Sequence, residues 1–131
     1  MNYDEVLRVG RVMGSKLRRR SSEKGVVVTT NVNSKGERLA IAISFNICKE
    51  LDLHRGESFN IVELPNGRIC LCKVREALGF KLTGNSTRSR SHYLYIPRFR
   101  TVKDTVIGVI EDGLIMFEAG SFEATGDDSN D

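Results

Sequence analysis

The chain has 131 residues, 40% of them hydrophobic and 28% charged, as in one soluble globular domain. No apolar run approaches the roughly 20 residues of a membrane-spanning helix, which excludes a transmembrane protein, and we expect no membrane partner. The N-terminal residues also lack the continuous apolar stretch of a secretory signal, so we expect a cytoplasmic location. All 20 Lys and Arg lie in residues 1–103 with 9 of the acidic residues, whereas residues 104–131 hold 8 acidic residues and no basic one, a division that favours a polyanion partner.

Residues 1–22 are predicted to form an N-terminal basic helix. Within 3–20, Val6, Val9 and Met13 follow one another at spacings of three and four residues, as on one face of a helix. Acidic residues lie in the first turn and basic residues in the last, which suits the helix dipole. Ser21-Ser22 ends the predicted helix.

A β-hairpin is predicted over residues 26–43. The β-branched run 26–32 favours a strand, and Asn33-Ser34-Lys35-Gly36 favours a turn. Residues 38–43 then alternate, with Leu39, Ile41 and Ile43 on one face. We expect that face to be buried.

A short helix and a second hairpin follow. Ser44 is a plausible N-cap for a helix over 45–53. The strands 58–64 and 68–74 flank the turn Pro65-Asn66-Gly67, and their apolar residues alternate.

The second half of the chain is predicted to hold three strands and a tail. Residues 80–91 are polar and rich in Gly, Ser, Thr and Arg, so we expect a loop linking two halves. Strands are predicted over 92–96, 105–110 and 114–118. The acidic residues 120–131 are expected to be a disordered tail.

Two stretches share one plan, which indicates an internal repeat. Residues 34–75 and 90–118 each contain a strand, a chain reversal and an acid-led hairpin with an Asx-Gly turn. The alternative is that such patterns recur by chance in a β-rich chain. The predicted fold class is mainly β with short helices (α+β), with one domain over 23–119.

The first copy resembles the AbrB family of swapped-hairpin domains, also called SpoVT-AbrB or MazE-like. The resemblance rests on short motifs: Ala40-Ile41-Ala42-Ile43-Ser44, Leu51-Asp52-Leu53, Arg55-Gly56-Glu57-Ser58-Phe59-Asn60-Ile61 and Asn66-Gly67-Arg68-Ile69-Cys70-Leu71. The second copy adds Tyr95-Ile96-Pro97, Asp104-Thr105-Val106 and Glu111-Asp112-Gly113-Leu114-Ile115. Ser44 stands where the family has proline and Asp52 where it has glycine, and the second copy has almost no helix.

This resemblance implies a fold and a function. Two such halves would interlock into one small β-barrel, here within one chain as a pseudo-dimer of MraZ-like arrangement, or as a homodimer. The resemblance implies a small bacterial or phage DNA-binding regulator of transcription. It places DNA contacts at Arg38, with Lys35 nearby, and at Arg55.

Two further basic clusters are predicted to contact double-stranded DNA, because Arg and Lys suit phosphate oxygens. The first cluster is Lys16, Arg18, Arg19 and Arg20; the second is Arg88, Arg90, Arg98 and Arg100. The second cluster is interleaved with His92, Tyr93 and Tyr95. The alternative for each arginine is a solvated surface position.

No enzyme signature is present in the sequence, so we expect neither catalysis nor a cofactor. It has no Gly-rich phosphate loop, nucleophile elbow or metal-binding His pair. Cys70 and Cys72 share a strand face, but Cys48, His54 and His92 show no spacing that completes a zinc site. We therefore expect no metal site, and three reduced, buried or half-buried thiols.

Two other functions stay open. The acidic C-terminal end and the exposed aromatic residues could bind a protein partner, as in an antitoxin core or a phage protein that binds a host enzyme. Tyr93 and Tyr95 could instead stack on the bases of single-stranded nucleic acid.

Overall fold

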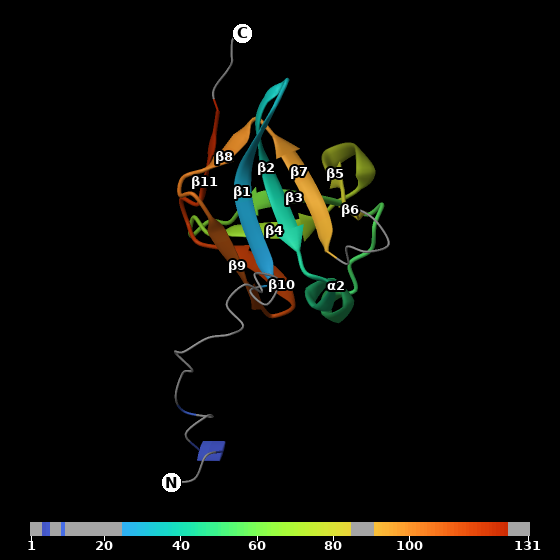
Figure 1. Ribbon diagram of the computed structural model, residues 1–131, viewed down its shortest axis with the longest axis vertical. Coiled ribbons are helices and arrows are strands. Elements are labelled where there is room, and N and C mark those ends of the chain that lie inside the picture. The colour runs from blue at the N-terminus through green and yellow to red at the C-terminus, as the bar shows by residue number, and fades with distance from the viewer. Residues whose placement is uncertain (1–3, 6–8, 10–24, 85–90, 126–131) are drawn as a thin grey trace.

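The computed structural model describes residues 4–5, 9, 25–84 and 91–125, and among these the fold is mainly β (Figure 1). One short α-helix, α2 (Phe45–Leu51), and one 3-10 turn, η2 (Glu76–Leu78), lie between the strands. The strands are β1 (Val26–Asn33), β2 (Gly36–Ile43), β3 (Ser58–Glu63), β4 (Ile69–Lys73), β5 (Phe80–Lys81), β6 (Thr83–Gly84), β7 (His92–Pro97), β8 (Phe99–Thr101), β9 (Val106–Glu111), β10 (Leu114–Phe117) and β11 (Phe122–Ala124).

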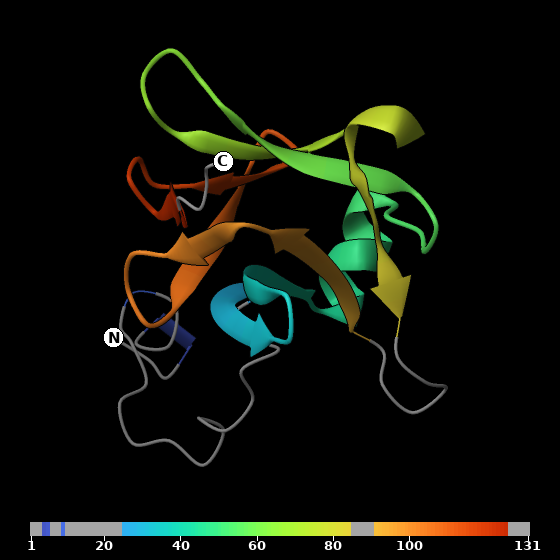
Figure 2. The same cartoon turned by 90° about the horizontal axis from the view of Figure 1, so that it is seen from above.

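Nine strands form one antiparallel sheet that is nearly closed into a barrel. Their order is β5-β3-β4-β10-β9-β1-β2-β7-β6. The two edge strands β5 and β6 are separated in sequence only by Leu82, so one short segment pairs with β3 at one edge and with β7 at the other. In Figure 2 the hairpin β3–β4 lies on the opposite side of the molecule from the hairpin β1–β2.

The closing segment corrects one prediction. Residues 80–91 were predicted to be a polar loop, but Phe80–Gly84 provides both edge strands, and Leu82 is 1% exposed in the core. Backbone hydrogen bonds from Leu82 N to Glu57 O and from Gly56 N to Leu82 O fix it beside β3. A two-residue strand is too short to show an alternating pattern in the sequence. Residues 85–90 lie outside the described residues.

The strand order has an internal two-fold pattern. β2 pairs with β7, and β4 pairs with β10. The hairpin β3–β4 corresponds to the hairpin β9–β10. The outer neighbour of β3 is β5, and the outer neighbour of β9 is β1. The predicted copy 34–75 contains β2, β3 and β4, and the predicted copy 90–118 contains β7, β9 and β10. Each hairpin therefore pairs with a strand from the other half of the chain.

The hydrophobic alternation in the sequence matches the core. Leu39, Ile41 and Ile43 of β2 are fully buried, and the first two pair with the buried Ile96 and Leu94 of β7. Ile69 and Leu71 join the same core, whereas Cys70 and Cys72 alternate onto the other face of β4. At Gly108 an added Cβ would lie 2.9 Å from Phe117 Cε1 and 3.1 Å from Val26 Cβ, so only glycine lets these strands approach so closely.

The predicted helix is confirmed, although it is shorter than expected. Ser44 is its N-cap, since Ser44 Oγ accepts a hydrogen bond from Ile47 N at 3.4 Å. Asp52 ends it in the left-handed conformation, with φ of 60°. Asp tolerates that conformation better than most residues, so it can end a helix as glycine often does.

A second sheet of two strands corrects the boundary of the predicted tail. β8 pairs with β11, so residues 120–125 are ordered and not disordered. Thr101 N donates to Thr30 Oγ1 at 2.9 Å, and the two hydroxyl oxygens lie 2.9 Å apart, which fastens β8 to β1. The sequence pattern missed both strands because each has only three residues. Residues 126–131 lie outside the described residues.

The predicted N-terminal helix falls almost wholly outside the described residues. Of 3–20, only Asp4, Glu5 and Val9 are described, and all three are helical. Within the part of the chain that the structure describes, no helix is long and apolar enough to cross a membrane.

Candidate nucleic-acid interface

A basic groove lies beside the end of β7 and next to the turn of the hairpin β1–β2. Its volume is about 750 Å³. Three of the cations predicted to bind DNA line it: Lys35, Arg38 and Arg98. Tyr95, Pro97 and Phe99 form much of its apolar lining. We call this set of residues the basic groove.

The register of the sheet explains why these cations converge. Lys35 lies in the turn between β1 and β2, where its N–H donates to Asn33 Oδ1 at 2.9 Å. Arg38 pairs directly with Pro97 across the β2–β7 ladder, which places it next to Arg98. In the sequence Arg38 and Arg98 belong to separate candidate groups, and strand pairing joins them.

Arg38 is held in place by two neighbours. Its Nε donates to Asn31 Oδ1 at 2.9 Å, and its guanidinium carbon lies 4.0 Å from the centre of the Tyr95 ring. A guanidinium over an aromatic face is attracted by the ring electrons. Asn31 was not among the predicted site residues, although its cross-strand pairing with Arg38 follows from the predicted hairpin.

Arg98 occupies an unusual backbone position. Its φ is 67°, in the left-handed region that costs most residues about 1 kcal/mol or more. Backbone hydrogen bonds hold it there, from Arg98 N to Glu37 O at 3.1 Å and from Thr125 N to Arg98 O at 3.0 Å. The side chain of Arg98 is exposed at the groove.

Arg100, which was predicted to contact DNA, already forms ion pairs with two carboxylates of the protein itself. Its Nε donates to Glu123 Oε2 at 2.7 Å, and its Nη1 donates to Glu37 Oε1 at 3.2 Å. These hydrogen bonds, above all the one that Arg100 donates to Glu123, raise the pKa of Arg100. Arg100 shares its one positive charge between two carboxylates, of which Glu37 lines the groove, and the groove has three cations besides: Lys35, Arg38 and Arg98.

The other predicted contacts are not at the groove. Arg55 lies at the opposite end of β7, where its side chain packs against Gly84, the partner of His92. Six predicted residues lie outside the described residues: Lys16, Arg18, Arg19, Arg20, Arg88 and Arg90.

Two tyrosines continue the row that begins at Arg38. Tyr93 and Tyr95 project from the outer face of β7, opposite Ala42 and Ala40 of β2. Their ring centres lie 6.5 Å apart, and the planes are tilted by only 12°. The small alanines leave room for the rings to lie on the sheet. Arg38, Tyr95 and Tyr93 therefore form one row of planar groups.

The cysteines are thiols in the structure. Cys48 and Cys70 are buried, and Cys72 is half-buried, with its Sγ 3.5 Å from Cys70 Sγ. Burial raises the pKa of Cys48 and that of Cys70 to about 11. Among the described residues, no three of His, Cys, Asp and Glu come together as a metal site.

The comparisons with known proteins give no identification. No protein family, no curated protein and no solved structure matches the chain.

Proposed function

We propose that the protein binds nucleic acid through the basic groove, and that its ligand is double-stranded DNA. The observation that carries the proposal is the meeting of three cations, Lys35, Arg38 and Arg98, at one groove whose lining has a single carboxylate, Glu37. Phosphate oxygens are the ligands that such cations bind most readily, and Arg can offer two parallel hydrogen bonds.

The hairpin β1–β2 supports the choice of a duplex. β1 pairs with β9 only through Val28 and β2 pairs with β7 only from Arg38 onward, so residues 31–36 extend beyond both neighbours. All six of these residues are exposed. A two-stranded ribbon fits the major groove of DNA. Lys35 in its turn and Arg38 farther along β2 would then lie within reach of the phosphates.

The strand order supports an AbrB-like swapped-hairpin barrel, which we propose as the finer fold. The two predicted copies pair with each other through β2–β7 and through β4–β10, and β9 of the second copy pairs with β1. Under this proposal the chain is an intrachain pseudo-dimer and a transcriptional regulator of bacterial or phage type.

The test is fluorescence anisotropy with labelled duplex DNA over a series of salt concentrations. Lys35→Ala with Arg38→Ala should weaken binding and flatten the log–log salt dependence by about 0.9 per lost phosphate contact. Lys49→Ala with Arg75→Ala is the matched control, since it removes the same charge from exposed positions on α2 and beside η2. Absence of binding at low salt, or equal losses in the two double variants, would overturn the proposal.

A second candidate ligand is single-stranded nucleic acid. The row of Arg38, Tyr95 and Tyr93 favours it, because unpaired bases stack on aromatic rings and on guanidinium planes. Tighter binding of a single strand than of a duplex of equal length would favour this candidate over the first.

A protein partner at the acidic C-terminal end stays a prediction. Within the described part of that end, Glu123 already pairs with Arg100. This pairing reduces the negative charge that the end offers to a partner.

A further inference from the structure

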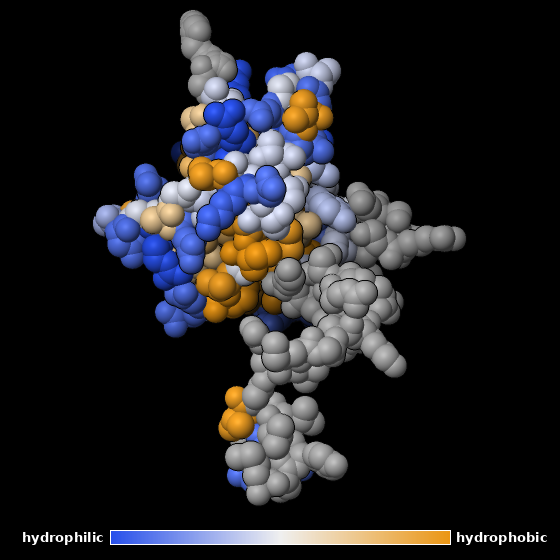
Figure 3. All heavy atoms as spheres, turned by 60° about the vertical axis from the view of Figure 1, so that its left-hand side comes forward, coloured by the Kyte–Doolittle hydropathy of each residue, from blue (hydrophilic) through white to orange (hydrophobic). Residues whose placement is uncertain are grey.

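The outer face of β9 and β10 carries apolar side chains that point away from the core. Ile107, Val109 and Leu114 are 40%, 47% and 48% exposed, and Met116 lies between them and β4. Figure 3 shows apolar residues gathered on this side of the molecule. We call Ile107, Val109, Leu114 and Met116 the outer apolar face.

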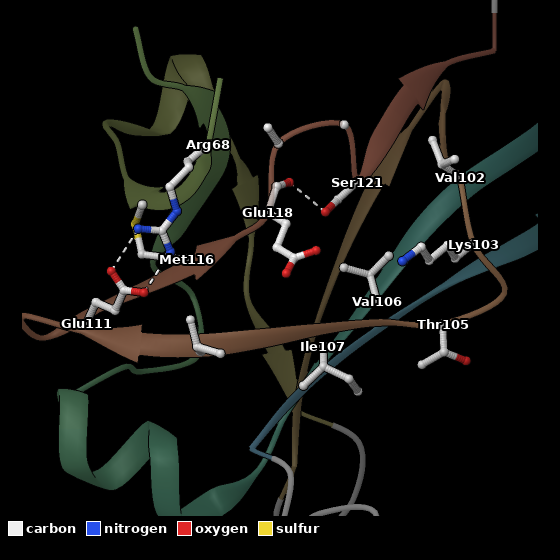
Figure 4. A pocket seen from close by; sticks show the side chains of 13 residues that line it. Arg68, Val102, Lys103, Thr105, Val106, Ile107, Glu111, Met116, Glu118 and Ser121 are labelled. Carbon is white, nitrogen blue, oxygen red and sulfur yellow. Dashed lines mark hydrogen bonds and ion pairs between the residues drawn. The ribbon is translucent and has the colours of Figure 1, made fainter. Parts of the chain in front are cut away.

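A hollow of about 570 Å³ lies on this face. Arg68 closes one end by donating two hydrogen bonds to Glu111, at 2.8 and 2.7 Å, and Lys103 and Thr105 lie at the other end (Figure 4). Val102, which is 55% exposed, adds to the apolar lining. The hollow is therefore an open trough with an apolar floor and charged ends, and its lining shares no residue with the basic groove.

The N-terminal segment joins the barrel at the edge of this face. Val26 pairs with Gly108 and Val27 pairs with Ile107, so the chain preceding Gly25 begins next to β9. Residues 1–24 come before this point. A helix over 3–20 would be about 27 Å long, enough to cross a sheet face several strands wide.

The segment and the face are complementary in polarity. Val6, Val9, Met13 and Leu17 would form one apolar stripe on a helix, with basic residues around it. Val9, the stripe residue that the structure describes, is 70% exposed, so its side chain is uncovered. The hollow on this face is lined by two carboxylates, Glu111 and Glu118, and by two cations, Arg68 and Lys103, so its charges balance and the match with the segment is one of apolar surface.

We propose that the N-terminal segment of the same chain docks on the outer apolar face as an amphipathic helix. The stripe of Val6, Val9, Met13 and Leu17 covers Ile107, Val109 and Leu114. Docking removes both exposed apolar surfaces from water, which stabilises the docked form.

Limited trypsin digestion of the full chain tests this proposal, because trypsin needs an extended backbone at its cleavage site. Cleavage after Arg8 and Arg11 is followed by mass spectrometry. Val109→Asp should raise the cleavage rate about tenfold, since proteolysis follows the population of the undocked form. Val32→Asp is the matched control; Val32 is 71% exposed at the far tip of β1–β2, and its change should leave the rate as in the wild type.

A reciprocal variant guards against a fold defect in the barrel. Val9→Asp changes the segment alone and should give the same acceleration. Equal rates for the wild type, Val9→Asp and Val109→Asp would overturn the proposal. Protection that grows with protein concentration would also overturn it, since the occupant would then be a second copy of the chain.

Discussion

The guanidinium of Arg38 lies against the ring of Tyr95, with 4.0 Å between its central carbon and the ring centre. The two residues come from neighbouring strands, and Ala40 leaves the space in which Tyr95 lies. Arg38 is thus already oriented before any ligand binds. Preorganised side chains lose less conformational entropy on binding, so this pair is expected to matter more for affinity than a mobile surface arginine.

Tyr95→Ala should weaken nucleic-acid binding because it removes the support of Arg38 and one stacking surface. If the bound strand stacks on the row, the loss is about 1–3 kcal/mol per base. Anisotropy titrations with duplex and single-stranded ligands measure it. Tyr93→Ala leaves the Arg38–Tyr95 contact intact and separates the two effects. A Tyr95→Ala protein that binds both ligands like the wild type would contradict the role given to the row.

Leu82→Ala should destabilise the barrel at the point where the sheet closes. Leu82 is 1% exposed, and truncation of such a residue costs about 2–5 kcal/mol. Urea unfolding measures the change. Leu78→Ala, at a position that is 57% exposed, is the control and should change stability little. Equal effects of the two substitutions would contradict the closing role of residues 80–84.

Gly108→Ala should destabilise the protein, although alanine is the smallest change available. The new methyl group would lie 2.9 Å from Phe117 Cε1 and 3.2 Å from Ile115 Cγ2, so the core must shift. Overpacking of this kind costs about 1–3 kcal/mol. Thermal unfolding of the two proteins would show it, and an unchanged midpoint would mean that β1 and β9 can separate at no cost.

The salt bridge between Arg68 and Glu111 should make the free energy of unfolding depend on pH in the acidic range. Its hydrogen bonds lower the pKa of Glu111 in the folded protein below the ordinary value of 4.5. The stabilisation is therefore complete at a pH above the pKa that Glu111 has in the unfolded chain. It is lost as the pH falls through the pKa that Glu111 has in the folded protein. Glu111→Gln should reduce the loss of stability between neutral and acidic pH, measured as urea midpoints. Arg68→Gln breaks the same bridge from the other side and should give the same flatter profile; a profile like the wild type in both would contradict this account.

Much of the secondary structure could be predicted from the sequence because local patterns decide it. The alternation of Leu39, Ile41 and Ile43 predicted the buried face of β2, and Asp112-Gly113 predicted the turn between β9 and β10. Both turn residues have positive φ, which a two-residue hairpin turn requires. Short strands such as β5, β8 and β11 escaped prediction because two or three residues hold no period.

The sequence by itself determined which faces of the long strands are buried and where the charges are concentrated. Only the tertiary structure decided which charges meet. The pairing of β2 with β7 places Arg38 next to Arg98, and the pairing of β8 with β11 places Glu123 within hydrogen-bond distance of Arg100. The physical reason is one of distance along the chain. Hydrophobic alternation relates residues that are two positions apart, so it can be recognised locally in the sequence. The basic groove joins residues about 60 positions apart, and their meeting depends on the register in which the whole sheet closes.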